Sequence, residues 1–198
     1  MPRSPATHDS QISELGERIA ALKRERASLI RARPRETVPD LVLTTLDGLP
    51  CTLSELMGER DELFVVHNMG KRCRYCALWA DGFIGLARHL STRAPFVLCA
   101  NDPPAVARET AARRGWTFTV VCNAKQADGR GFSQSLGYGT GEDVYPGISA
   151  FRRVRHDDGT VELTRTAHAS FGPGDDFCAV WPALELLGVG EDDFRPGD

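Results

Sequence analysis

The chain has 198 residues, of which 41% are hydrophobic and 26% are charged, and its formal net charge is −3. A chain of this length and composition can bury a full hydrophobic core, which excludes a disordered or fibrous protein. The small negative charge creates no field that would draw the protein to nucleic acid or to an anionic membrane. We therefore expect neither as a partner.

No segment approaches the roughly 18 consecutive apolar residues of a membrane span. The first eleven residues are polar and contain no apolar core of a secretory signal. These features predict a cytoplasmic protein, in a reducing compartment where structural disulfides are rare. The six cysteines therefore need an explanation other than a disulfide scaffold.

The first predicted element is a helix over residues 10–33, in which apolar residues recur every three or four positions. Ser10 is its expected N-cap, and Pro34 ends it. The apolar stripe is narrow, which leaves two interpretations open. The helix is either an arm packed on its own domain or a short seam of a homodimer.

Strand and helix patterns then alternate along the chain. Strands are expected at residues 41–46, 63–67, 95–100, 117–122, 148–155 and 161–166. Helices are expected at residues 73–90, 101–114 and 175–187, the last one bent at Pro182. The alternation predicts parallel strands, and the closing hairpin makes the sheet mixed, so the fold class is an α/β three-layer sandwich.

We divide the chain into an N-terminal helical arm over residues 1–36, an α/β domain over residues 37–188 and an acidic tail over residues 189–198. The tail is expected to be loose, because acidic residues and glycines dominate it and no apolar pattern continues.

Cys73 and Cys76 form the one closely spaced cysteine pair, where a buried strand turns into a helix. Ligands bind at this edge of an α/β sheet. The helix N-terminus and the flanking Lys71, Arg72 and Arg74 are expected to favour a thiolate at Cys73. Cys76 lies one helical turn further on, where it can resolve a mixed disulfide. The pair therefore predicts thiol–disulfide exchange without a cofactor.

Two other uses of the same thiols remain open. One is a metal-binding module for Zn or Cu(I), although no second cysteine pair completes a zinc site. Met69 and His67 beside the thiols form a soft ligand set suited to Cu(I), with His168 as a more distant candidate. The other is a binding protein in which the pair is incidental.

His67 ends the strand that leads into the cysteine turn. It is a candidate to hold the proton of Cys76 during resolution, because histidine titrates near neutral pH. The alternative is a core histidine with satisfied hydrogen bonds. The other four cysteines are interpreted as small buried hydrophobic residues rather than accessory thiols: Cys51, Cys99, Cys122 and Cys178.

The element order and the CxxC pair resemble the thioredoxin superfamily. A closer resemblance is to a bacterial family of predicted dithiol–disulfide oxidoreductases. It rests on the block NMGKRCRYCALWADGF at residues 68–83 and on shorter matches at residues 114–116, 146–149 and 171–177. It covers about residues 12–187.

The resemblance implies a thioredoxin-like fold, with Cys73 as the attacking thiol, Cys76 as the resolving thiol and Pro146 as a cis-proline beside them. We expect a cis Tyr145–Pro146 bond to expose the backbone of Tyr145 for pairing with an extended substrate. The tryptophan-glycine-proline signature of thioredoxins is missing, because Arg74 and Tyr75 stand between the cysteines.

Five residues are therefore expected to bind substrate: Arg72, Arg74, Tyr75, Tyr145 and Pro146. The expected redox partner is a protein or a small thiol. The peroxiredoxin threonine three residues before the nucleophile is replaced by Gly70, which disfavours peroxidase activity.

Overall fold

The computed structural model describes residues 5–197, and the chain divides into two compact units, Met1–Arg35 and Glu36–Asp198. Residues 1–4 of the predicted arm and residue 198 of the predicted tail lie outside the described residues. In the first unit, helix α1 covers Pro5–Ala32, so it begins five residues before the expected cap at Ser10. Proline is tolerated in the first turn of a helix, where its missing N–H has no partner to lose.

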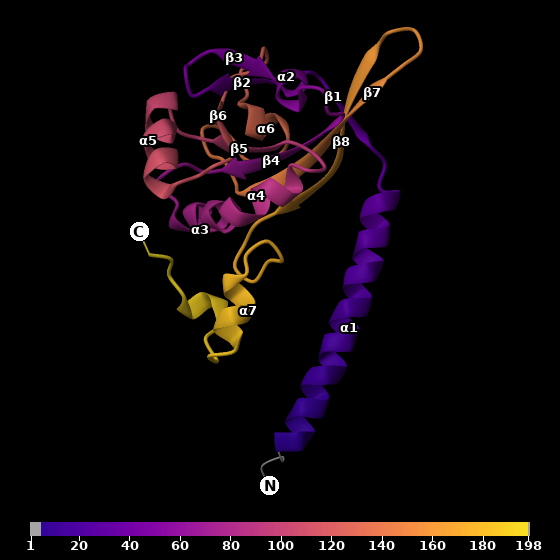
Figure 1. The fold of residues 1–198 in the computed structure, drawn as a ribbon, viewed down its shortest axis with the longest axis vertical. Coiled ribbons are helices and arrows are strands. Elements are labelled where there is room, and N and C mark those ends of the chain that lie inside the picture. Colours follow the sequence, from indigo (N-terminus) through magenta and orange to yellow (C-terminus); the bar gives the residue numbers. More distant parts are fainter. Residues whose placement is uncertain (1–4, 198) are drawn as a thin grey trace. The chain divides into compact units, whose positions relative to one another are not determined.

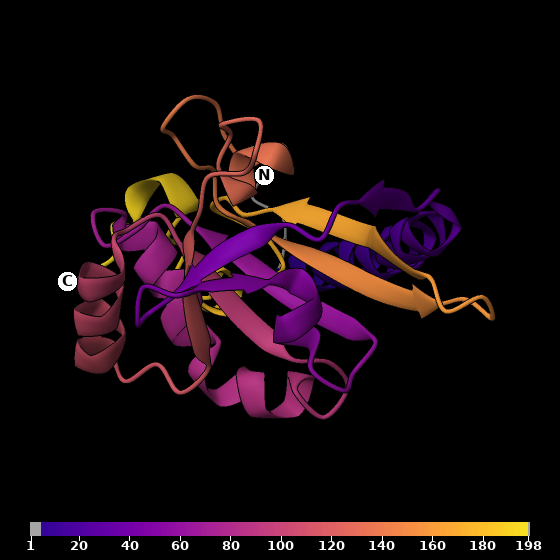
Figure 2. The same ribbon diagram turned by 90° about the horizontal axis from the view of Figure 1, so that it is seen from above.

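The second unit is built on one mixed sheet of eight strands in the order β1-β8-β7-β4-β5-β6-β2-β3 (Figures 1 and 2). Strand β4 pairs in parallel with β5, and β5 pairs in parallel with β6, while the outer strands pair antiparallel. The strands are β1 (Glu36–Val38), β2 (Val42–Thr45), β3 (Pro50–Thr52), β4 (Glu62–Asn68), β5 (Phe96–Ala100), β6 (Thr119–Asn123), β7 (Gly147–Arg155) and β8 (Val161–Ser170). This arrangement confirms the predicted α/β class.

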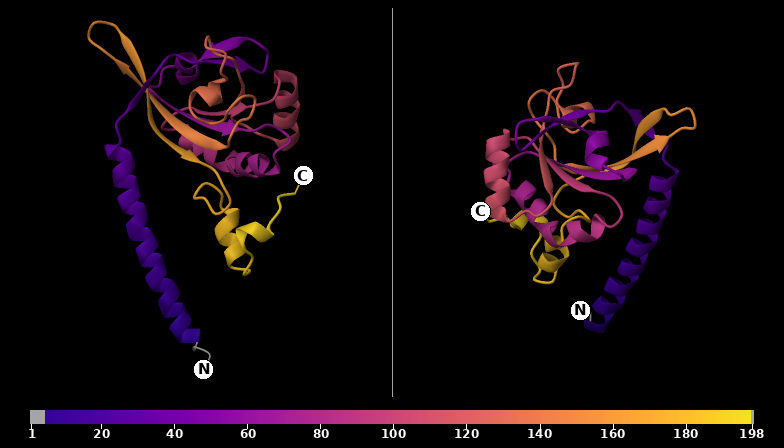
Figure 3. Two further views of the ribbon diagram at one scale, coloured as in Figure 1. Left: turned by 180° about the vertical axis from the view of Figure 1, so that it is seen from behind. Right: turned by 45° about the horizontal axis from the view of Figure 1, so that its top comes forward.

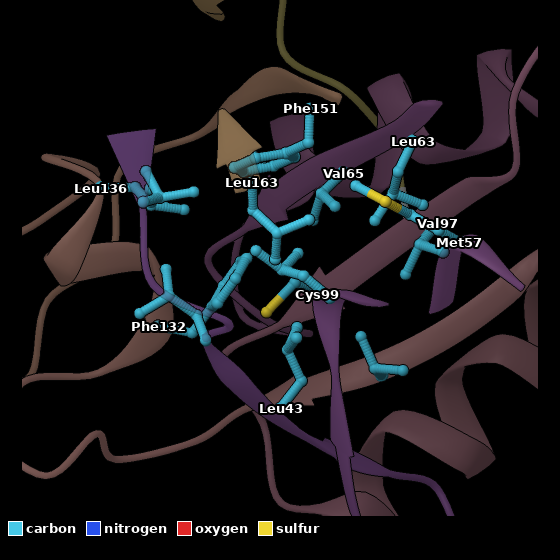
Figure 4. Packing of buried hydrophobic residues seen from close by; sticks show 14 of the residues in the cluster. Leu43, Met57, Leu63, Val65, Val97, Cys99, Phe132, Leu136, Phe151 and Leu163 are labelled. Carbon is cyan, nitrogen blue, oxygen red and sulfur yellow. The ribbon is translucent and has the colours of Figure 1, made fainter. Parts of the chain in front are cut away.

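Helices and loops cover both faces of the sheet (Figure 3). The helices of this unit are α2 (Leu53–Met57), α3 (Arg74–Gly82), α4 (Ile84–Leu90), α5 (Pro104–Arg114), α6 (Phe132–Ser135), α7 (Val180–Glu185) and the short 3-10 turn η1 (Glu191–Asp193). Side chains of α3, α4, α5 and α7 pack on one face in a cluster that includes Trp79 and Phe171. On the other face, α2 and α6 contribute to a second cluster, which includes Phe132, Leu43 and Leu163 (Figure 4).

The expected helix over residues 73–90 is two helices, because the chain breaks at Phe83. Gly82 and Gly85 flank the break and have low helix propensity. The break turns the Phe83 ring inward, where it lies 4.9 Å from the ring of Phe96 and 6.3 Å from that of Phe171, measured between ring centres. Burial of the Phe83 ring offsets the free energy that is lost where the helix is interrupted.

The last helix is also shorter than expected. It begins at Val180, which places Pro182 in its first turn, where proline costs no backbone hydrogen bond. Residues before it form a turn in which the Asp175 carboxylate accepts hydrogen bonds from the amides of Gly172 (2.9 Å) and Phe177 (2.7 Å). Among the described residues, no helix is long and apolar enough to cross a membrane.

Candidate active site

Cys73 is the N-cap of α3, at the edge of the sheet where β4 ends. Its backbone is extended (φ −94°, ψ 104°), and its sulfur accepts a hydrogen bond from the amide of Cys76 at 3.1 Å. Cys73 is partly exposed, whereas Cys76 is 2% exposed, and both are free thiols. The pair therefore presents one accessible sulfur and one shielded sulfur.

The two thiols have strongly different proton affinities. A hydrogen bond from the Cys76 thiol, with help from the amides of Cys76 and Tyr75, lowers the pKa of Cys73 to about 6. The same thiol–thiol hydrogen bond, together with burial, raises the pKa of Cys76. The helix N-terminus acts as expected, but the cations Lys71, Arg72 and Arg74 are not among the causes of the lowered Cys73 pKa. All three residues are exposed, so solvent screens their charges.

Two residues that the sequence analysis did not single out hold the cysteine turn. The Asn68 side chain accepts from the amide of Gly70 (2.8 Å) and donates to the carbonyl of Cys76 (3.3 Å). The Asp102 carboxylate accepts from the amide of Lys71 at 2.7 Å. Gly70 has φ +98°, and a Cβ there would lie 2.7 Å from an oxygen of Asp102. Asn68 ends β4, and Asp102 follows the end of the adjacent parallel strand β5. Polar residues at these positions are the sequence signal that could have predicted both.

A cavity of about 450 Å³ opens beside Cys73. It is lined by Met69, Arg72, Cys73, Arg74, Tyr75, Arg195 and Pro196. Three of the expected substrate-binding residues, Arg72, Arg74 and Tyr75, therefore lie beside the accessible thiol.

Arg195 and Pro196 of the tail line this cavity, so the expectation of a loose tail is wrong. The Tyr75 hydroxyl donates to the carbonyl of Phe194 at 2.8 Å, and the Phe194 ring packs edge-on against Trp181 with ring centres 6.1 Å apart. Phe194, an aromatic residue among acidic ones, provides this anchor. The acidic composition of the tail does not indicate it. Arg195 and Pro196 thereby become site residues that the sequence analysis missed.

The structure does not bring His67 to the thiols. Strand alternation turns His67 to the face opposite α3, where its ring stacks on Tyr138 with centres 3.9 Å apart. Its Nδ1 and Nε2 lie 2.9 Å and 3.0 Å from the hydroxyls of Ser133 and Ser149. Burial, and secondarily the positive charge of Arg165, lowers its pKa to about 3. The geometry matches the alternative interpretation, a neutral core histidine.

The expected cis bond at Tyr145–Pro146 is wrong, because no described peptide bond is cis. Proline fits the trans bond here, since its carbonyl accepts from the amide of Phe171 (3.0 Å) and the Tyr145 amide donates to the Tyr138 carbonyl (3.1 Å). Gly147, the next residue, pairs with His67, so Pro146 still lies at the sheet edge near the end of β4. Neither Tyr145 nor Pro146 lines the cavity beside Cys73.

The other four cysteines are buried within the two hydrophobic clusters. Burial raises the pKa of Cys122 to about 11 and raises that of Cys99, so both stay protonated at neutral pH. No group of three or more His, Cys, Asp or Glu side chains among residues 5–197 is arranged to hold a metal ion. In particular, His67 is turned away from Met69 and the thiols.

A family model described as "Bacterial protein of unknown function (DUF899)" matches residues 9–193. No curated protein matches the chain. Solved structures with the same fold include a variant of peroxiredoxin Q from Xanthomonas campestris, at 15% identity and TM-score 0.52, covering 75% of this chain and 92% of that chain.

A peroxiredoxin-like protein from Aquifex aeolicus is 12% identical, with TM-score 0.52, and the match covers 77% of this chain and 86% of that chain. A hypothetical protein from Sinorhizobium meliloti 1021 is 14% identical, with TM-score 0.52, and the match covers 83% of this chain and 87% of that chain. At these identities the likeness shows the fold, which is thioredoxin-like.

Proposed function

We propose that this chain, which belongs to the DUF899 family of bacterial proteins, is a dithiol–disulfide oxidoreductase in which Cys73 attacks and Cys76 resolves. The observation that carries the proposal is the geometry of the pair: the accessible Cys73 sulfur caps α3 and accepts a hydrogen bond from the amide of Cys76 at 3.1 Å, while the Cys76 sulfur is buried. The pKa of Cys73 is lowered to about 6, and that of Cys76 is raised. A thiolate is the attacking species in disulfide exchange, so this asymmetry assigns the two roles.

In the reducing direction, the Cys73 thiolate attacks one sulfur of a disulfide substrate. A Cys73–substrate disulfide forms, the substrate S–S bond breaks, and one thiolate leaves and takes a proton from solvent. The Cys76 thiol then loses its proton, and its sulfur attacks the Sγ of Cys73. The second substrate thiol leaves, the substrate has gained two electrons, and Cys73 and Cys76 are joined as a disulfide.

The geometry assists the second step. Formation of the mixed disulfide removes the negative charge on Cys73 that keeps the Cys76 thiol protonated. The amide of Met69 lies 3.4 Å from the Cys76 sulfur and is placed to stabilise its thiolate as it forms. Resolution of the mixed disulfide therefore needs no histidine. The redox partner in this proposal is a cytoplasmic protein or a small thiol.

A single-turnover experiment with bis(2-hydroxyethyl) disulfide tests the proposal. The reduced protein is expected to release two thiols per chain and to end with a Cys73–Cys76 disulfide. Cys76→Ser is expected to release one thiol and to keep one 2-mercaptoethanol in a mixed disulfide, located on Cys73 by peptide mass. Cys73→Ser is the matched control and is expected to react far more slowly. An adduct on Cys76, or no thiol release from the unmodified chain, would refute the role assignment.

The metal-binding alternative uses the same two sulfurs and is tested on the same preparations. Purified, reduced protein is analysed for copper and zinc, with Cys73→Ser alongside. One equivalent of metal that is lost in the variant would favour the metal-binding module over the exchange enzyme. Sub-stoichiometric metal in both proteins, together with two released thiols, supports the exchange enzyme.

A further inference from the structure

The cavity beside Cys73 is cationic at its rim. Arg72 and Arg195 line it from two segments more than a hundred residues apart in sequence, and Met69, Tyr75 and Pro196 supply apolar walls. Among the described residues, no carboxylate lines the cavity. The acidic residues of η1 precede Phe194 and lie outside this lining. An anionic group that enters the cavity therefore meets the guanidinium groups of Arg72 and Arg195, with Arg74 as the third arginine of the lining, and no carboxylate.

Arg195 is held in place rather than left mobile. Its Nη1 donates to the Tyr75 hydroxyl (3.2 Å) and to the carbonyls of Phe194 (3.0 Å) and Asp192 (3.1 Å). Within the part of the chain that the structure describes, all its hydrogen bonds use Nη1, which leaves Nε and Nη2 available. A guanidinium fixed in this way can donate in parallel to both oxygens of a carboxylate.

We propose that this cavity binds the carboxylate-bearing arm of a small disulfide, with Arg72 and Arg195 as the residues that determine this specificity. The inference rests on the proposed oxidoreductase function and adds its substrate class. The cavity volume of about 450 Å³ lies in the range of small-molecule sites, about 300–1,000 Å³. The accessible sulfur opens into the same cavity, so the arm that forms the mixed disulfide with Cys73 lies beside the two arginines.

The reaction follows the exchange already described. The Cys73 thiolate attacks the sulfur that carries the bound arm, the substrate S–S bond breaks, and the other arm leaves as a thiolate that takes a proton from solvent. Cys76 then attacks Cys73 and loses its proton, and the bound arm departs as the second thiol. The two arginines hold the carboxylate through both steps and take no part in the electron transfer.

Three disulfides whose arms share a two-methylene spacer test the proposal because their terminal groups differ in charge. Dithiodipropionate carries two carboxylates, bis(2-hydroxyethyl) disulfide is neutral, and cystamine carries two ammonium groups. Single-turnover rates are measured with the full-length reduced protein and with Arg72→Ala, Arg195→Ala and Arg195→Lys. Arg88→Ala, which removes an exposed arginine on α4 that does not line the cavity, is the matched control. The ratio of the unmodified rate to the variant rate is compared for each disulfide, so that leaving-group differences cancel.

Arg72→Ala and Arg195→Ala are each expected to slow oxidation by dithiodipropionate about three- to tenfold, the range for a partly exposed, charge-assisted contact. The rates with the neutral disulfide should stay within about twofold, and those with cystamine should be unchanged or faster. Arg195→Lys should keep part of the preference because it keeps the charge. High salt should remove the preference, since it screens an exposed charge pair.

Equal slowing with all three disulfides would overturn the substrate class while leaving the oxidoreductase function intact. The alkylation midpoint of Cys73 separates the causes of such a result. A midpoint that moves in the arginine variants would mean that the arginines act on the thiolate rather than on the substrate. If none of the three disulfides oxidises Cys73 in the unmodified chain, it is the proposed function itself that fails.

Discussion

Replacement of Cys76 by alanine is expected to raise the pKa of Cys73 and slow its reaction at neutral pH. The largest cause of the lowered Cys73 pKa is the hydrogen bond from the Cys76 thiol, and Cys76→Ala removes it. The backbone amides of Cys76 and Tyr75 remain in place, so part of the lowering should persist. Cys76→Ala therefore separates the contribution of the second thiol from that of the helix N-terminus.

The size of the effect follows from the strength of one bond. A hydrogen bond to a charged group contributes about 1.5–3 kcal/mol, and one pKa unit corresponds to about 1.4 kcal/mol. The Cys73 pKa is therefore expected to rise from about 6 by one to two units. At pH 6.5 the thiolate fraction would fall from about three quarters to a quarter or less.

The rate of alkylation by iodoacetamide between pH 4 and pH 10 measures this pKa, with Cys73 followed by peptide mass. The other four cysteines are buried and should react slowly in the folded chain. Cys76→Ser retains a hydroxyl donor, so its midpoint should fall between those of the unmodified chain and Cys76→Ala. Cys122→Ala is the control for loss of an unrelated thiol and should not move the midpoint. A midpoint that stays near 6 in Cys76→Ala would refute the role of the thiol–thiol hydrogen bond.

Three further predictions concern the surroundings of the pair. His67 is neutral in the folded chain with a pKa of about 3, but binds a proton near pH 6.5 when unfolded. The free energy of unfolding should therefore fall by up to about 1.4 kcal/mol per pH unit as the pH drops from 6.5 towards 3, and urea titrations of His67→Asn should show a shallower fall. Tyr75→Phe removes the bond to the Phe194 carbonyl, so amide exchange over residues 191–197 should be faster. Leu15→Lys combined with Leu22→Lys should lower the sedimentation coefficient if α1 forms a dimer seam, because both leucines are more than half exposed within a regular stripe.

The first two of these predictions have matched controls. His156→Asn makes the same replacement at an exposed histidine and is the control for the first prediction. Tyr145→Phe removes a hydroxyl from a half-exposed ring and should not alter exchange in the tail. Equal slopes for the unmodified chain and His67→Asn, unchanged exchange in Tyr75→Phe, or a monomer in both sedimentation runs would contradict the respective prediction.

The sequence predicted the elements that depend on local pattern. Apolar runs identified β4, β5 and β6, because a strand buried on both faces has few polar positions. The helix expected over residues 101–114 corresponds to α5, which begins at Pro104. Strand β1 was missed, because three residues carry no usable periodicity and its pairing with β8 spans more than a hundred residues.

The position of the cysteine pair at a helix N-terminus was likewise readable from the sequence, since a strand, a glycine turn and an amphipathic segment follow one another within about twenty residues. The sequence did not show which other residues surround the pair. The face to which His67 turns depends on sheet pairing, and the trans bond at Pro146 depends on contacts with Tyr138 and Phe171. The attachment of the tail depends on one hydroxyl of Tyr75 and one ring of Phe194, which come together only when α3 and α7 pack on the same face of the sheet. Local sequence places the cysteine pair at a helix N-terminus, whereas tertiary packing alone decides which residues distant in sequence surround it.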